Sequence, residues 1–485
     1  MTELAFQPAI RLAAAIRDRR VSAAELLDLY LARADRYNPR INAVIIMDVD
    51  GARRRARAAD EALADGKVWG PLHGVPMTVK ESFDVAGLPT TWGVPALRDN
   101  IASSNALAVD RLLGAGAIVF GKTNVPIHLA DWQSYNEIYG TTNNPWDVTR
   151  TPGGSSGGAA AALAAGLTAL EMGSDIGASI RNPAHYCGTF GHKPTYGICP
   201  PRGHALPGSY AQADISVIGP LARSTDDLEL ALSVTAGPDP LDGPGLRLDL
   251  APPRHERLRD FRIAVMLTDP NCAQDDAMTA VLQALVDRIA RAGAIVGDTA
   301  RPEIDTRAAH ALYVRLLRAA TSGRVAEDEH RRQIAEAERL DPRDESYYAR
   351  MIRANTLRHR DWLIANNERQ RMRRVWAEFF REWDLLLCPV AASAAFPHDH
   401  VGERQDRTVP VNGRPEPTTD QLFWAGLSGM VYLPSTVAPA GFTPDGLPVG
   451  IQIVAPHLED RTCLQLARLI EREFGGFVAP PGYEG

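Results

Sequence analysis

TPGGSSGGAAAALAAG, residues 151–166, places two glycine pairs around two adjacent serines and continues into a run of small apolar residues. Gly/Ser-rich stretches are often flexible linkers. This stretch instead runs directly into residues 159–173, whose small side chains suit a tightly packed, buried helix. Glycines in such a place permit strained dihedral angles and close approach of the backbone to a ligand. We therefore interpret Ser155 and Ser156 as part of a site at the start of a buried helix, where an anion or oxyanion is favoured.

The composition argues against several classes of function. The 485 residues contain 52 Lys and Arg against 59 Asp and Glu, a net charge of −7, and the arginines are scattered, so a nucleic-acid partner is not expected. The five cysteines are odd in number and form no C-x-x-C pair, which argues against a disulfide framework and a zinc cluster. The chain has neither a secretory leader pattern nor a stretch of about 18 apolar residues. We expect a cytoplasmic location, with no membrane partner, no cofactor and no metal.

Helical and strand patterns alternate along the first part of the chain. Apolar residues recur at helical spacing over residues 8–66. The segments LHGVPMTVKESFDV (72–85) and AIVFGKTNV (117–125) are short β-branched runs bounded by Gly and Pro, which predicts buried strands. A helix is expected between them, over residues 105–113. This alternation predicts an α/β sandwich with a mixed central sheet between helices.

The remaining sequence predicts one interrupted domain rather than two domains. Residues 236–255 are rich in Pro and Gly, and residues 275–380 contain charged amphipathic helices that suggest an inserted helical layer. Strand signals return at DLLLCPV (384–390) and GLPVGIQIVAP (446–456). We therefore predict a single domain over residues 1–485, divided into N-terminal helices (1–66), a catalytic core (70–235), a connector with a helical insertion (236–383), and a return to the sheet with a final helix (384–485).

Two short patterns imitate binding sites. GAIVFGKT, residues 116–123, has the letters of a phosphate-binding loop, but that loop needs its GKT to open a helix. Here AIVF itself reads as the strand, and a proline follows four residues after Lys122. His398 and His400 flank an aspartate, but no matching ligand pair stands at zinc-like spacing. We therefore assign neither nucleotide binding nor metal binding.

A second loop with catalytic character lies in GSDIGASIRNPAHYCGTFGHKPTYG, residues 173–197, where Ser179 follows a glycine-containing turn. Asp175 and Arg181 have opposite charges and are close enough in sequence to clamp this turn; an ordinary surface ion pair is the alternative. Successive backbone N–H groups in the turn are suited to hold a developing oxyanion. The candidate amides are those of Ile176, Gly177, Ala178 and Ser179.

A serine nucleophile needs a base, and the sequence offers two kinds. Histidine is the usual base, and His185 and His192 lie near Ser179 in sequence, but no G-x-S-x-G elbow surrounds that serine. Lys80 instead stands within an apolar strand, where desolvation favours the neutral amine that a base requires. The alternative for Lys80 is a lysine at a strand edge that extends to water.

Several motifs together resemble the amidase signature family of serine hydrolases. In chain order they are HGVPMTVKES (73–82), FGKTNVP (120–126), NNPWDVTRTPGGSSGG (143–158), GSDIGASIRNPA (173–184) and GTFGHKPTYG (188–197). The resemblance covers most of the chain and implies the amidase signature fold, with the helical insertion over the active site. It also implies that Ser179 is the nucleophile, that Lys80 is the base, and that Ser155 stands between them after a cis peptide bond at Gly154. Ser156 would then support the hydrogen-bond network or be an inert loop serine.

The chain departs from the family pattern at two alanines. Ala178 stands where the family commonly repeats glycine before the nucleophile, and Ala159 stands where serine is frequent. An alanine keeps its N–H group, so the oxyanion amides survive at position 178 if its φ angle is negative. We expect the methyl group of Ala178 to narrow the pocket.

Three further segments are candidates for the walls of the site. ADWQSYNEIYG, residues 130–140, contains Trp132 and Tyr135, which the resemblance places near the active site as substrate contacts; core aromatics are the alternative. Residues 200–214 form a Gly/Pro-rich loop that suggests a mobile wall of the entrance. The helical region 300–380 suggests a cover over the substrate pocket, through Tyr313, Leu316, Trp362 and Ile364.

These observations predict a hydrolase of carbon–nitrogen bonds that acts on small or chain-like neutral substrates. Amides are the family default, and the same triad can attack carbamates (urethanes) and esters. The alternative enzyme is the glutaminase subunit of a tRNA-dependent amidotransferase, which needs a partner subunit; a scaffold with an inactive site is the non-enzymatic alternative. We expect a monomer or homodimer with a small-molecule substrate.

Overall fold

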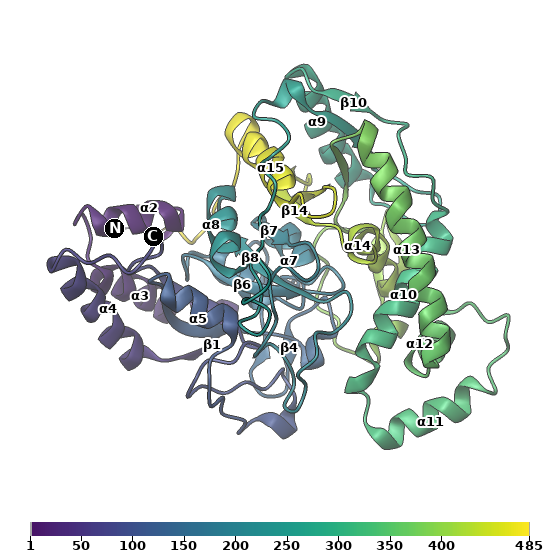
Figure 1. Ribbon diagram of the computed structural model, residues 1–485, viewed down its shortest axis with the longest axis horizontal. Helices are drawn as coiled ribbons and strands as arrows, with labels where there is room; N and C mark the ends of the chain where they lie inside the picture. The colour runs from purple at the N-terminus through teal and green to yellow at the C-terminus, as the bar shows by residue number, and fades with distance from the viewer. Residues whose placement is uncertain (1, 485) are drawn as a thin grey trace.

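An eight-stranded mixed sheet forms the centre of the fold (Figure 1), and the computed structural model describes residues 2–484. The strands are ordered β10-β9-β11-β15-β14-β7-β8-β6 across the sheet. Strands β10, β9 and β11 run parallel, and every other neighbouring pair is antiparallel. The strands are β6 (Glu171–Asp175), β7 (Phe190–Lys193), β8 (Val217–Ala222), β9 (Arg262–Val265), β10 (Ile295–Gly297), β11 (Leu385–Pro389), β14 (Ser435–Phe442) and β15 (Pro448–Val454).

Both faces of this sheet are buried. Successive side chains of a strand point to opposite faces, and both sets pack in hydrophobic clusters. In β11, Leu385 and Leu387 pack in one hydrophobic cluster, whereas Leu386 and Cys388 pack in another. One face is covered by α8 (Thr225–Thr235), α9 (Asp276–Arg291) and α15 (Asp460–Phe474), and the other by α6 (Gly157–Ala164) and α7 (Arg181–Cys187). The predicted α/β sandwich with a mixed sheet is confirmed.

The two strands predicted before residue 130 belong to a second, smaller sheet. Its order is β1-β3-β2, formed by β1 (Val44–Met47), β2 (Pro76–Lys80) and β3 (Ile118–Thr123). The GKT letters lie inside β3 and open no helix, so this segment has no phosphate-loop geometry. This part of the chain also contains the helices α1 (Thr2–Ala5), α2 (Ala9–Arg17), α3 (Ala23–Ile41), α4 (Val49–Ala64) and α5 (Leu107–Gly114).

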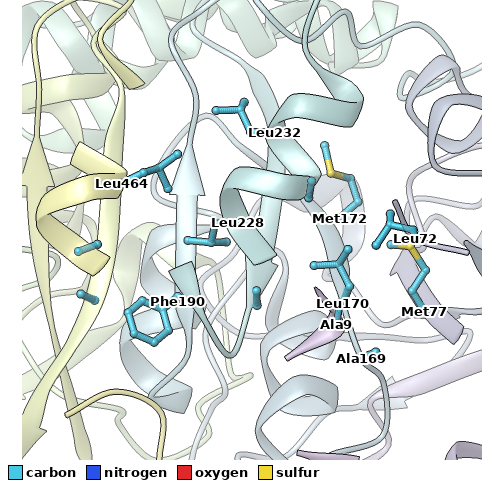
Figure 2. Close-up of a cluster of buried hydrophobic side chains, with 14 of the residues drawn as sticks. Ala9, Leu72, Met77, Ala169, Leu170, Met172, Phe190, Leu228, Leu232 and Leu464 are labelled. Atoms are coloured by element: carbon cyan, nitrogen blue, oxygen red, sulfur yellow. The ribbon is translucent and has the colours of Figure 1, made fainter. Parts of the chain in front are cut away.

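A continuous hydrophobic core joins the two sheets (Figure 2). Met77 of β2 and Met172 of β6 belong to the same buried cluster as Leu228 of α8 and Leu464 of α15. This continuity supports the predicted organisation as one domain, which stays a prediction.

The segment 236–383 is only partly the helical insertion that the sequence predicts. It contributes strands β9 and β10 and helix α9 to the central sandwich, and only residues 306–382 form the outer helical layer. This layer lies on the side of the molecule away from α3 and α4 (Figure 1). Its helices are α10 (Thr306–Thr321), α11 (Glu327–Ala337), α12 (Tyr347–Asn355) and α13 (His359–Glu382), and α14 (Leu422–Gly429) packs against α10.

Short elements complete the fold. They are β4 (Tyr135–Asn136), β5 (Gly140–Thr141), β12 (Thr408–Val411), β13 (Arg414–Pro417), and the 3₁₀ turns η1 (Pro95–Leu97), η2 (Ile127–Leu129), η3 (Leu258–Asp260), η4 (Ser322–Arg324), η5 (Arg404–Asp406) and η6 (Thr418–Gln421). Over residues 2–484, none of the helices has both the length and the apolar character needed to cross a membrane.

Candidate active site

Lys80 ends strand β2 inside the protein. Its side chain is fully buried, and Nζ donates to Ser155 Oγ at 2.6 Å and to Ser174 Oγ at 3.0 Å. Desolvation lowers the pKa of Lys80 well below its ordinary value of 10.5; the charge of Arg324 acts in the same direction, and nearby carboxylates oppose it. Burial therefore favours the neutral amine. The alternative of a lysine that extends to water from a strand edge is wrong.

The glycines around Ser155 allow the backbone to pack closely against its neighbours. A Cβ atom on Gly154 would lie 2.3 Å from Asp131 O, and one on Gly158 would lie 2.4 Å from Asn124 N. The predicted cis peptide bond joins Gly154 to Ser155. The segment is therefore a fixed part of the interior, and it leads directly into the fully buried helix α6.

Ser156 connects the two serine loops. Its backbone N–H donates to Ser179 O at 3.1 Å, and its hydroxyl lies 3.4 Å from both the N–H and the carbonyl oxygen of Ser174. Ser179 is therefore held next to Ser156 and hence next to the loop that carries Ser155. Over residues 2–484, however, no hydrogen bond joins the hydroxyl groups of Ser155 and Ser179, so the relay between them is not preformed.

Asp175 and Arg181 form a buried clamp around the Ser179 turn. Arg181 Nη2 lies 2.8 Å from Asp175 Oδ1, and both side chains are at most 1% exposed. Burial alone would raise the pKa of Asp175, but the charge and hydrogen bonds of Arg181 outweigh it and hold this pKa below its ordinary value. The guanidinium also donates to Gln452 Oε1 at 2.7 Å, which ties the turn to β15. The alternative of a surface ion pair is wrong.

Ala178 does not meet the condition of a negative φ angle under which its N–H would serve as an oxyanion amide. Its φ angle is +71°, not negative, and its N–H group donates to Asp175 Oδ1 at 3.0 Å. This N–H is therefore occupied by the clamp. Over residues 2–484, the N–H groups of Ile176, Gly177 and Ser179 meet no acceptor within hydrogen-bond distance, so these three are the amides left open to an oxyanion.

Two aromatic side chains fix the orientation of this turn. Tyr313 Oη of α10 donates to Ile176 O at 2.8 Å, and Trp132 Nε1 donates to Gly177 O at 2.7 Å. Because the C=O and the next N–H of a trans peptide point in opposite directions, each bond also aims the following amide. The structure thus places Trp132 and Tyr313 at the site, where each side chain donates a hydrogen bond to a carbonyl oxygen of the turn.

Tyr135 is engaged elsewhere. Its ring stacks on His400 with centroids 3.7 Å apart, and its hydroxyl accepts a hydrogen bond from Arg407 at 2.9 Å. His398 contacts Asn143 Oδ1 at 3.1 Å. The role of Tyr135 as a substrate contact stays a prediction.

The two histidines near Ser179 in sequence have structural partners. His185 Nδ1 accepts from Gly450 N at 2.7 Å, and burial lowers the pKa of His185 to about 4. His192 bonds to Thr436 of β14 and to Asp460 at the start of α15. Neither histidine contacts Lys80, Ser155 or Ser179 through any hydrogen bond of the described residues. The structure therefore brings the lysine, not a histidine, to the serines.

Sequence reasoning missed three residues near Lys80. Ser174, its second partner, lies in a quoted motif but carries no distinguishing pattern. His204 is buried in the loop 200–214 and bonds to Ser82 Oγ at 2.9 Å. Arg324 ends η4 and acts on the pKa of both Lys80 and His204. Only the tertiary fold brings these segments together.

Comparison with known proteins agrees with this arrangement. The sequence matches the model of the family described as Amidase over residues 25–464. It is 33% identical to the indoleacetamide hydrolase of Bradyrhizobium diazoefficiens, over 96% of this chain and 86% of that protein. It is 32% identical to one of the subunits of the glutamyl-tRNA(Gln) amidotransferase of Anaeromyxobacter sp., over 96% of each chain. Its fold resembles a bacterial aryl acylamidase of the amidase signature enzymes, with a TM-score of 0.83, 23% identity, and 98% and 99% of the two chains covered.

Proposed function

This chain belongs to the amidase family, the amidase signature enzymes, and on that basis we propose that it hydrolyses amides through an acyl-enzyme on Ser179. One observation carries the proposal: Lys80 Nζ is buried at 2.6 Å from Ser155 Oγ. A buried amine without its proton is a base, and it lies beside a hydroxyl that can pass a proton on.

The chemistry follows from these groups. Ser179 Oγ attacks the amide carbon and gives its proton to Ser155 Oγ, while Ser155 gives its own proton to Lys80 Nζ. The carbon–nitrogen bond then breaks, and the departing nitrogen takes a proton back through Ser155. Water enters, its proton follows the same path, and the acid leaves Ser179. The first transfer requires Ser179 Oγ to approach Ser155 Oγ once substrate is bound.

The developing oxyanion is assigned to the open amides of the turn. The N–H groups of Ile176, Gly177 and Ser179 supply the donors, and the buried pair of Asp175 and Arg181 holds them in place without reorganisation. Carbamates and esters present the same carbonyl geometry, so we propose them as further substrates of the same triad.

Turnover of a 4-nitroanilide tests this proposal. We expect Ser179→Ala to abolish turnover and Lys80→Ala to reduce it by orders of magnitude, with unchanged circular dichroism.

Wild-type activity should rise with pH as Lys80 loses its proton, with a midpoint well below 10.5 because its pKa is lowered. His185→Gln and His192→Gln serve as controls and should still label with a fluorophosphonate. A folded histidine variant as inactive as Ser179→Ala would refute the assignment. A panel of anilide, aliphatic amide, carbamate and ester substrates ranks the substrate classes.

A second candidate function is the glutaminase reaction of an amidotransferase. It is favoured by the 32% identity to the amidotransferase chain of Anaeromyxobacter sp. over 96% of each chain. Release of ammonia from glutamine faster than hydrolysis of an anilide, or co-purification of a second subunit, would favour this function over a free-standing amidase.

A further inference from the structure

Arg324 is a cation that faces the interior without an acidic partner. It ends η4, directly after α10, and its side chain is partly buried. Its Nη1 donates to His128 O at 3.0 Å, and its Cζ lies 5.0 Å from the centroid of the Trp92 ring. Over residues 2–484, no carboxylate lies within ion-pair distance of this guanidinium. A partly buried guanidinium without an acidic partner is a place where an anion from outside the chain would be favoured.

Two neighbouring nitrogens are also without partners. Trp92 is 3% exposed, and its indole Nε1 is buried and has no hydrogen-bond partner within residues 2–484. The same holds for Nδ1 of His128. Arg324 joins the other two residues: its guanidinium lies over the Trp92 ring and binds the backbone oxygen of His128, and His128 N donates to Trp92 O at 2.8 Å. Most buried polar atoms in proteins have partners, so two nitrogens without partners in the described part of the chain, beside a cation that has no acidic partner there, indicate a site built to receive acceptor oxygens.

This cluster adjoins the proposed catalytic lysine. The Trp92 ring lies 5.2 Å from the ring of His204, and His204 Nε2 lies 2.9 Å from Ser82 Oγ, two residues after Lys80. The charge of Arg324 also acts on Lys80. An oxygen ligand on the cluster would therefore lie on the side where His204 and Ser82 meet the end of β2.

The carboxylate of Glu81 is already used. Glu81 accepts hydrogen bonds from the backbone N–H groups of Thr91 and Trp92, the latter at 2.9 Å. It fixes the backbone of residue 92, leaves the indole nitrogen without a partner among the described residues, and forms no ion pair with the guanidinium. The cluster is thus a set of donors and positive charge, which suits an anion and disfavours an ammonium group.

We propose that Arg324, Trp92 and His128 form a carboxylate-binding subsite, and that the preferred substrates are amides that bear a carboxylate. This inference rests on the proposed function and changes the expectation of neutral substrates. The alternative role is purely structural: Arg324 would only hold α10 against the turn at residue 128. Loss of a purely structural Arg324, a strut, would lower kcat/KM for all substrates alike. Loss of a subsite would lower it further for substrates that carry the anion.

Matched substrate pairs separate the two roles. On the acyl side, the 4-nitroanilide of succinic acid carries a carboxylate where that of butyric acid has a methyl group. On the amine side, 4-acetamidobenzoate is paired with 4-methylacetanilide. We expect wild-type kcat/KM to favour the carboxylate member of at least one pair by about ten- to hundredfold, the effect of charged hydrogen bonds. Equal kcat/KM within both pairs would overturn the proposal.

Variants assign the preference to named groups. Arg324→Gln should remove the preference, mainly by raising KM for the carboxylate substrate, so that kcat/KM becomes similar for the two members of a pair. Trp92→Phe keeps the ring and loses only the N–H, so it should remove part of the preference. Arg318→Gln, on the preceding helix α10 and bonded to Tyr347, is the matched control and should not change the preference. Loss of both substrates equally in Arg324→Gln would overturn the subsite in favour of the strut.

Two further measurements complete the test. Arg404 also has buried guanidinium nitrogens without partners, and loss of the preference in Arg404→Gln, with Arg324→Gln unaffected, would overturn the assignment to Arg324. Binding of the succinic anilide to Ser179→Ala by calorimetry does not depend on turnover. If binding of the succinic anilide requires Arg324 but the wild-type protein hydrolyses no anilide, the subsite is supported and the proposed hydrolase is refuted. Turnover of both butyric and succinic anilides without dependence on Arg324 would do the reverse.

Discussion

At Ala178 the chain keeps a side chain in a backbone conformation that favours glycine. The left-handed region brings Cβ close to the following carbonyl oxygen, which costs about 1 to 2 kcal/mol for a residue other than glycine. The turn is held in this shape from both sides, by Asp175 on the Ala178 N–H and by Trp132 on the Gly177 carbonyl. These fixed contacts explain how an alanine adopts the conformation that glycine would adopt more easily.

Substitutions at position 178 test this explanation. We expect Ala178→Gly to change the free energy of unfolding by less than about 1 kcal/mol, because relief of the positive φ offsets the loss of a buried methyl group. Ala178→Val should lower it by more than about 2 kcal/mol and reduce anilide turnover, because a β-branched residue is poorly tolerated at positive φ and the site is fully buried. Urea denaturation with turnover assays measures both. A valine variant as stable as the glycine variant would contradict the importance of this backbone geometry.

Residue patterns predicted which residues belong to the site better than they predicted the geometry of those residues. Apolar neighbours marked Lys80 as buried, and the glycine pairs marked Ser155 as part of a fixed loop, since both signals are local. The φ of Ala178 could not be predicted from its neighbours in sequence, because it is set by Asp175 and Trp132 from outside the turn. Arg324 was missed for the same reason: its sequence neighbours say nothing about the indole that it meets.

At the scale of elements, the loop 200–214 is fastened to helix α13. Arg369 Nη1 lies 2.7 Å from Asp214 Oδ2, with the arginine side chain 1% and the aspartate side chain 16% exposed. The hydroxyl of Tyr432 donates to the other oxygen of Asp214, and Arg369 lies over the Tyr432 ring at 4.5 Å. Tyr210, by contrast, is almost fully exposed. One end of the predicted mobile wall is therefore anchored to the helical layer, and its mobility stays a prediction.

Removal of this anchor should loosen the loop. We expect Asp214→Ala to lower the free energy of unfolding by about 3 kcal/mol, because it leaves the buried Arg369 charge uncompensated. Proteolytic cleavage within 200–214 should become faster at the same time. Glu368→Ala is the matched control: it breaks an exposed pair with Arg371 on the same helix and should cost less than about 1 kcal/mol. Similar effects of the two variants on unfolding and on cleavage would show that the anchor does not hold the loop.

Elements with strong periodicity were predicted well, and short ones were not. The amphipathic helices and the strands near residues 80, 120, 387 and 451 follow from local pattern. Strands β9 and β10 were missed inside the predicted helical insertion, because they have only four and three residues and lie next to Arg-rich helical sequence. Their place is decided by parallel pairing with β11, a contact between distant segments.

At the scale of the whole molecule, Glu171 stands where the two sheets meet. It begins β6 of the central sheet, is fully buried, and accepts a hydrogen bond from Thr78 of β2 in the smaller sheet. Lys80, two residues after Thr78, binds Ser155 and Ser174 across the same junction. The site thus depends on how the two sheets are joined.

The family resemblance predicted the overall class of fold, but the strand pattern did not predict this junction. The sequence offered strands near residues 80 and 120 with no sign that they form a sheet of their own. Strand order depends on pairing between segments far apart in the chain, and the period of two residues along a strand carries no information about its neighbour.

The junction predicts how stability depends on pH. Burial raises the pKa of Glu171 from 4.5 to about 8, so the folded protein keeps a proton that the unfolded chain releases. The stability from this group is complete below pH 4.5 and is lost as pH rises through 8. Glu171→Gln replaces the protonated acid with a neutral group of similar shape. We expect the free energy of unfolding of Glu171→Gln to be close to that of wild type at about pH 5. At about pH 9 it should be higher than that of wild type by a few kcal/mol. Hydrogen bonds with Ser22 lower the pKa of the exposed Glu25, so Glu25→Gln is a control without the alkaline gain. A constant difference between wild type and Glu171→Gln across this range in urea titrations would mean that Glu171 does not hold its proton at the junction.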